Sequence, residues 1–257
     1  MERETVTVIV PTFNRARYLR ECLDSLLAQS LPADEIIVVD DGSEDDTPAV
    51  AASFGSRIIY LRKENGGKPL AVNFALEKCT GSLVWLFDDD DVALPQAIES
   101  RVRALAEAPE AGFVYSPHHL GTDGPDRLIR RGRLYVPPTP TAERFFLELM
   151  SGCFFHLNSA LVRRSLYAAA GPFDPALKAG EDYDMQIRLA RLGRPAFSPE
   201  PSFVFRQHSG LRGDRGSRYA AEERARVFRR YSAQLGRKIR ASVSIGEFLV
   251  PRQQGDP

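Results

Sequence analysis

The sequence lacks the features that mark several large classes of protein. Its 257 residues include only three cysteines, Cys22, Cys79 and Cys153, which lie far apart and without metal-ligand spacing. We interpret them as reduced thiols of a cytosolic protein rather than as a disulfide or a zinc site. No apolar run approaches the roughly 20 residues that cross a bilayer, and the charged N-terminus does not resemble a signal peptide. The expected location is therefore the cytoplasm.

The chain also lacks an excess of either charge and two common nucleotide motifs. Lys plus Arg and Asp plus Glu both number 34, so the formal net charge is zero. This balance argues against a nucleic-acid partner held by a global positive field. The sequence contains no Gly-x-x-x-x-Gly-Lys-Ser/Thr, and no Gly-x-Gly-x-x-Gly follows the first expected strand. Kinase, P-loop ATPase and ordinary dehydrogenase functions therefore lose their main support.

Short apolar runs alternate with helical patterns in the first half of the chain. The expected strands cover residues 6–10 (closed by Pro11), 36–39, 58–61 and 83–87. Helices are expected at residues 18–27, 48–54 and 69–78, and after Pro95. Because the strands are continuously apolar, we predict an α/β fold with a mostly parallel sheet and helices on both faces.

The second half is less regular, but no clean linker divides it from the first. Strands are expected near residues 113–115 and 159–162 and a helix at 183–192, whereas the Arg- and Pro-rich residues 121–140 read as a long loop. We predict one domain with three parts: a nucleotide-binding half at about 1–115, an acceptor and catalytic half at about 116–215, and a basic helical extension at about 216–257.

Polar segments follow four of the expected strands, at residues 11–15, 40–43, 65–68 and 88–91. In a parallel sheet the carboxyl ends of the strands meet at one edge, where ligands bind. Carboxylates there can hold a hard divalent cation, and Lys68 or Arg15 can face a phosphate. The combination indicates a nucleoside diphosphate bound through a metal. Taken singly, each segment is also typical of a turn or a solvated loop.

Five segments in this order resemble the motifs of family 2 glycosyltransferases, which have the Rossmann-like GT-A fold. They are Val-Ile-Val-Pro-Thr-Phe-Asn-Arg (8–15), Ile-Ile-Val-Val-Asp-Asp-Gly-Ser (36–43), Asn-Gly-Gly-Lys (65–68), Leu-Phe-Asp-Asp-Asp-Asp (86–91) and Gly-Glu-Asp-Tyr-Asp-Met-Gln-Ile-Arg-Leu (180–189). The resemblance covers about residues 5–208. One motif alone is weak, but five in order are specific.

The resemblance implies roles for particular residues. Pro11, Thr12, Phe13 and Asp41 match the positions that hold the nucleobase, while Arg15 and Lys68 are candidates for the phosphates. Counting back from Pro95 places the metal-binding aspartate at Asp90, with Asp88 and Asp89 near the ribose and diphosphate; the four identical residues leave this register open. His208 matches a second metal or diphosphate ligand. Asp182 matches the general base, although an acid at a helix start is also common without catalysis.

The same resemblance implies a metal-dependent transferase that inverts the anomeric centre. The expected cofactor is Mg²⁺ or Mn²⁺, and the expected donor is a nucleotide-diphospho-sugar, with UDP favoured over GDP or dTDP. The acceptor would be a saccharide or a lipid-linked molecule. The Gln-x-x-Arg-Trp signature of processive polysaccharide synthases is absent, which favours a non-processive enzyme.

Two other functions and one further partner stay open. A sugar-nucleotide-forming nucleotidylyltransferase should carry a glycine-rich loop after the first strand, and residues 11–15 contain no glycine. A non-catalytic nucleotide-sugar-binding module should lack Asp90 or Asp182. Basic residues gather in two segments, which are a solvated surface or a peripheral contact with an anionic membrane. They are Arg127, Arg130, Arg131, Arg133, Arg224, Arg226, Arg229, Arg230, Arg237, Lys238 and Arg240.

Overall fold

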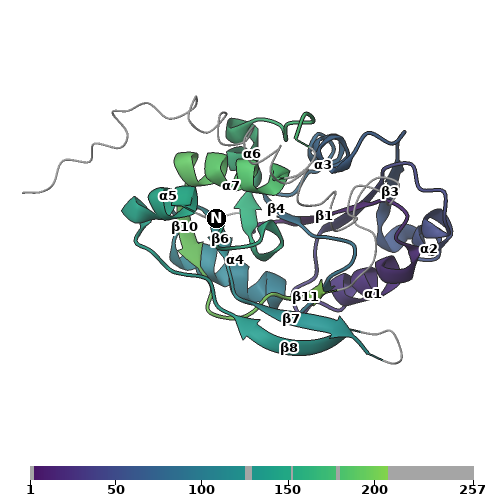
Figure 1. Ribbon diagram of the computed structural model, residues 1–257, viewed down its shortest axis with the longest axis horizontal. Coiled ribbons are helices and arrows are strands. Elements are labelled where there is room, and N and C mark those ends of the chain that lie inside the picture. Colours follow the sequence, from purple (N-terminus) through teal and green to yellow (C-terminus); the bar gives the residue numbers. More distant parts are fainter. Residues whose placement is uncertain (1–2, 125–128, 152, 178–179, 208–257) are drawn as a thin grey trace, which may run out of the picture.

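A seven-stranded sheet runs through the centre of the computed structural model, which describes residues 3–124, 129–151, 153–177 and 180–207 (Figure 1). In spatial order its strands are β10 (Arg194–Phe197), β6 (Ala111–Tyr115), β9 (Leu161–Arg163), β4 (Leu83–Leu86), β1 (Val6–Thr12), β2 (Glu35–Asp40) and β3 (Ile59–Arg62). Only β9 runs against its neighbours, β4 and β6. The predicted mostly parallel sheet is confirmed.

Side chains that alternate along each strand build two cores, one on each face of the sheet. On β1, Val6, Val8 and Val10 enter one core, and Ile9 enters the other. Each such fully buried side chain contributes roughly 1.5–3 kcal/mol to folding. Helices cover both faces, as predicted (Figure 1). The first core packs against α1 (Ala16–Leu27), α2 (Thr47–Ala52) and α4 (Ala97–Glu107), and the second against α3 (Lys68–Leu76), α5 (Ala142–Ser151), α6 (Arg164–Ala170) and α7 (Glu181–Leu192).

A second, four-stranded sheet lies beside the main one and was not predicted. Its order is β5 (Val92–Ala93), β11 (Phe203–Gln207), β7 (His118–Asp123) and β8 (Ile129–Tyr135). The prediction of a long loop over residues 121–140 is therefore wrong for the parts that form β7 and β8. β8 is an outer strand whose arginines are exposed, so its sequence shows no alternation of buried and exposed positions.

The first strand also continues beyond its predicted end at Pro11, because Pro11 and Thr12 still pair with β2. On its other side, the pairing of β1 with β4 stops at Ile9, so the missing amide hydrogen of Pro11 disturbs no ladder there. The predicted extension at 216–257 lies outside the described residues.

Candidate active site

The four polar segments that follow β1 to β4 meet at one edge of the main sheet, because these strands are parallel. Asn158 joins them from the other half of the chain. It lies in a short 3₁₀ turn, Leu157–Ser159, immediately before β9. Since β9 is antiparallel to β4, its beginning lies at the edge where β4 ends.

Asp41, predicted to contact the nucleobase, holds the loop between β3 and α3. Its buried carboxylate accepts hydrogen bonds from the Gly67 amide at 2.6 Å, the Gly66 amide at 3.0 Å and Lys63 Nζ at 2.7 Å. Beside it, Thr12 is buried at the end of β1 and Phe13 is partly buried in the loop that follows. The residues predicted to hold the nucleobase therefore lie together at one corner of the edge, where the chain itself already occupies both oxygens of Asp41.

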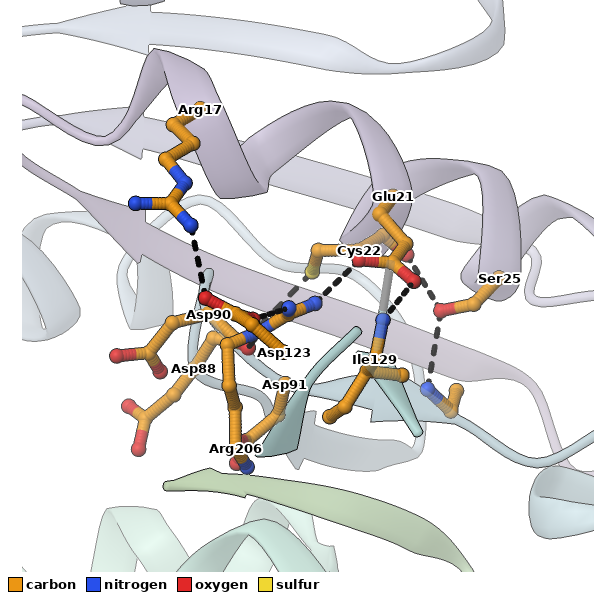
Figure 2. Close-up of polar contacts among 11 residues, drawn as sticks. Arg17, Glu21, Cys22, Ser25, Asp88, Asp90, Asp91, Asp123, Ile129 and Arg206 are labelled. Carbon is orange, nitrogen blue, oxygen red and sulfur yellow. Dashed lines mark hydrogen bonds and ion pairs between the residues drawn. The ribbon is translucent and has the colours of Figure 1, made fainter. Parts of the chain in front are cut away.

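The aspartate run supplies a group of carboxylates suited to a hard cation. Oxygens of Asp88, Asp90 and Asp91 lie within 4.8 Å of one another, and the side chains of Asp88 and Asp90 point the same way in Figure 2. The guanidinium of Arg15 lies 3.9 Å from Asp90. Oxygen ligands of this kind fit Mg²⁺ or Mn²⁺. His208, the other predicted ligand, lies outside the described residues.

Asp91 has a different place from the rest of the run, since both of its oxygens accept hydrogen bonds from the chain. Asn158 Nδ2 donates to one at 2.7 Å, and the backbone amide of Arg206 donates to the other at 2.8 Å. Asn158 Nδ2 also lies 3.1 Å from Asp88. Asp91 thus fixes the loop, which leaves Asp88 and Asp90 as the better candidates for a metal. The sequence prediction missed Asn158 because no pattern distinguishes one asparagine before a strand.

Burial and mutual repulsion weaken the ionisation of the inner aspartates. Burial, and then the charge of Asp90, raise the pKa of Asp89 to about 8. The same two causes, in the same order, raise the pKa of Asp91 well above its usual value. A divalent cation beside Asp88 and Asp90 would offset this crowding of negative charge, so the electrostatics of the loop also fit a metal.

Lys68 lies between the aspartate run (residues 88–91) and Asp182, the predicted general base. Its ammonium lies 2.8 Å from Asp88 Oδ1 and 3.1 Å from Asp182 Oδ2. Burial alone would lower the pKa of Lys68, but the carboxylates of Asp182 and Asp88 outweigh it and raise that pKa well above its usual value. A permanent cation therefore stands between two predicted site residues, as expected for a group that faces a phosphate.

Asp182 lies in the first turn of α7, where three acidic side chains gather. Its neighbour Glu181 has a pKa of about 7, raised first by burial and then by the charge of Asp182. Apolar residues further along the helix, among them Met185 and Leu189, anchor α7 in the second core. The helix thus presents Asp182 from a rigid support at the site edge.

Unpaired buried oxygens single out the same residues. Within the described ranges, five buried side-chain nitrogen or oxygen atoms have no hydrogen-bond partner, and three of them are Thr12 Oγ1, Asp89 Oδ2 and Asp182 Oδ1. The other two belong to Arg101. Buried polar atoms in native proteins are nearly always paired. The side chains of Thr12 and Asp89 lie close enough to interact with each other, so Asp182 Oδ1 is the oxygen of the three that is best suited to a bound ligand.

Residues 7–170 match the model of glycosyl transferase family 2. The chain belongs to this family. It is also 32% identical over 213 residues to an uncharacterized glycosyltransferase of Rickettsia prowazekii, a match that covers 79% of this chain and 64% of the relative. The chain thus spans about two thirds of that relative's length.

Solved structures agree on the fold of this family 2 chain. A Pyrobaculum calidifontis mannosyltransferase in complex with GDP-Man and Mn²⁺ is 26% identical, with a TM-score of 0.63, covering 96% of this chain and 67% of that one. The S. aureus protein TarS in complex with UDP-GlcNAc is 20% identical, with a TM-score of 0.65, covering 90% and 66%. The predicted GT-A fold is confirmed.

Proposed function

We propose that this family 2 chain is a metal-dependent, inverting and non-processive glycosyltransferase that moves a sugar from a nucleotide-diphosphate donor to a hydroxyl acceptor. One observation carries the proposal. Asp88 and Asp90 on one side and Asp182 on the other flank Lys68 at the ligand-binding edge of the sheet. This arrangement provides one set of groups for the leaving diphosphate and a separate carboxylate for the attacking hydroxyl.

The reaction divides between these groups. The acceptor oxygen bonds to the anomeric carbon as the bond from that carbon to the diphosphate oxygen breaks, and the hydroxyl proton passes to Asp182. A bound Mg²⁺ or Mn²⁺ would stabilise the charge that develops on the leaving diphosphate. Asp90, supported by Asp88, is the proposed ligand, and Lys68 and Arg15 would add positive charge near the phosphates.

The proposed donor is supported by the base corner, which is the group of residues predicted to hold the nucleobase, and by one structural neighbour. The mannosyltransferase bound to GDP-Man and Mn²⁺ supports a nucleotide-sugar with a divalent metal here too. We propose that Pro11, Thr12, Phe13 and Asp41 frame the nucleobase, with UDP as the first donor to test. The family match gives no support to a nucleotidylyltransferase, and a non-catalytic module would bind the donor without turning it over.

An acceptor carried on a membrane is a second element of the proposal. On β8, Arg130, Arg131, Arg133 and Leu134 are exposed, and so is Val136 just after this strand; the exposed fractions of Leu134 and Val136 are 43% and 57%. Cations near an anionic leaflet contribute about 1 kcal/mol each. Among the described residues, no helix is long and apolar enough to span a bilayer. The other basic residues named above, Arg127 and those after residue 207, lie outside the described part.

Donor hydrolysis tests the proposed function. Purified protein is incubated with UDP-, GDP- and dTDP-sugars, with Mn²⁺ or with EDTA, and free nucleoside diphosphate is measured. We expect release from one donor class that EDTA abolishes. Binding without release, with acceptor extract added, would favour the non-catalytic module. Sedimentation with phosphatidylserine vesicles but not phosphatidylcholine vesicles would support the membrane contact.

A further inference from the structure

One arginine is fully buried directly behind the aspartate run. Arg206 lies on β11, and its side chain has no exposed surface. Burying a guanidinium away from water is costly unless it is paired and hydrogen-bonded. The hydrogen-bond partners of Arg206 therefore indicate which part of the structure it holds in place.

Arg206 contacts the aspartate run through its backbone and its side chain. Its Nε donates to the carbonyl oxygen of Asp90 at 2.7 Å, and its amide donates to Asp91 Oδ1 at 2.8 Å. Figure 2 shows the guanidinium among these residues, beneath α1. Arg206 therefore restrains two consecutive residues of the loop, one of them the proposed metal ligand.

Two carboxylates from other elements hold the far side of the guanidinium. Glu21 of α1 and Asp123 of β7 accept hydrogen bonds from its two terminal nitrogens (Figure 2). Asp123 also accepts one from Arg17 at 2.8 Å, so the charges are balanced. Burial would lower the pKa of Arg206, but the bonds to Asp123 and Glu21 outweigh it and raise that pKa. The guanidinium is thus fixed in orientation as well as in charge.

We propose that Arg206 is a positioning residue for the metal, which sets the backbone of Asp90 so that its carboxylate faces the cation. This inference rests on the proposed function. Three directional donors are needed at once, toward Asp90, Asp123 and Glu21, and only a guanidinium supplies them in one plane. Lysine keeps the charge but loses this fork. Residues that orient a metal ligand commonly change metal affinity by about 10- to 100-fold when replaced.

The test measures metal dependence of nucleotide binding rather than turnover. UDP and GDP are titrated into Arg206→Lys and wild-type protein over a series of Mn²⁺ concentrations. We expect the Mn²⁺ concentration for half-maximal binding to rise by about 10- to 100-fold. At saturating Mn²⁺ the nucleotide affinity should return close to wild type. A merely structural role would lower the melting temperature without moving the Mn²⁺ requirement.

Arg163→Lys is the matched control. Arg163 Nε also donates to a backbone carbonyl, that of Ala111, and its terminal nitrogen also meets a carboxylate, that of Glu4. It pairs with Leu83 at the opposite end of β4 from the aspartates. We expect this variant to keep the wild-type Mn²⁺ requirement.

Asp123→Asn is a second variant, which keeps Arg206 but removes the charge of one of its partners. It tests the positioning role of Arg206 even where Arg206→Lys does not fold. We expect its Mn²⁺ requirement to shift in the same direction. An unchanged requirement in the folded variants, beside a wild type that needs Mn²⁺, overturns this inference alone. A wild type whose nucleotide binding ignores Mn²⁺ overturns the metal-dependent function and this inference with it.

Discussion

Among single residues, chemically identical side chains have different proposed roles. Asp91 is held by Asn158 and Arg206, whereas Asp90 lies beside Asp88 at the proposed metal position. Asp182 differs from both, because it pairs with Lys68, whose ammonium also pairs with Asp88. The environment of each carboxylate, and not its type, therefore sets what it can do.

Asp182→Asn tests the proposed base. The substitution keeps the shape and removes the proton acceptor, so turnover should fall by about 10²- to 10⁴-fold. Donor affinity should change little, because the proposed metal ligands stay in place. Steady-state kinetics and nucleotide titration are made on the same sample. Asp184→Asn is the control on the same helix: it breaks the pair with Arg188 and should lower stability while turnover is kept. Near-normal transfer by Asp182→Asn would move the role to Glu181.

Glu181 makes the stability of the chain depend on pH. Its pKa is about 7 in the folded protein and 4.5 without the fold, so the folded state holds this proton more tightly. Between these values a rise in pH lowers the free energy of unfolding, and above about 7 the loss is complete. Glu181→Gln removes the loss. We expect its melting temperature to exceed that of the wild type at pH 8 and to match it near pH 4.5. Equal differences at both pH values would contradict the raised pKa.

At the scale of elements, the strand ends were predictable and the second sheet was not. The four polar segments follow strands whose apolar runs are unbroken, so their common edge could be read from the sequence. β8 gave no such signal because it is an exposed edge strand. The role of Arg206 depends on β11 and β7 lying side by side, a pairing between residues far apart in the chain. No local pattern encodes such a contact.

Gly42, which follows Asp41, tests how closely the loops of the base corner must approach. Its φ is +86°, and a Cβ there would lie 2.9 Å from the backbone nitrogen of Asn65. Gly42→Ala should lower stability by more than about 1 kcal/mol and weaken nucleotide binding, since Asp41 and the 63–67 loop must separate. Gly55→Ala is the control: its φ is +56° but nothing lies within 4 Å. It should show the backbone strain alone, measured by thermal melting, with nucleotide affinity unchanged. Equal effects of both on binding would contradict the close approach.

Across the whole molecule, the proposed site draws on both halves of the chain. The first half supplies the base corner, Lys68 and the aspartate run, and the second supplies Asn158, Asp182 and Arg206. The five sequence motifs predicted most of these positions. Asn158 and Arg206 became visible only in the fold, because each acts through a neighbour.

The most direct test of a metal-dependent nucleotide site is calorimetric titration of UDP and GDP with and without Mn²⁺, on wild type and Asp90→Asn. We expect Mn²⁺ to strengthen nucleotide binding to the wild type. In the presence of Mn²⁺, Asp90→Asn should bind the nucleotide more weakly by about 3 kcal/mol or more, which is at least about 100-fold in affinity. Asp24→Asn removes the same charge from an exposed position on α1 and should bind as the wild type does. Unchanged Mn²⁺-dependent affinity in Asp90→Asn would contradict a metal held by Asp90.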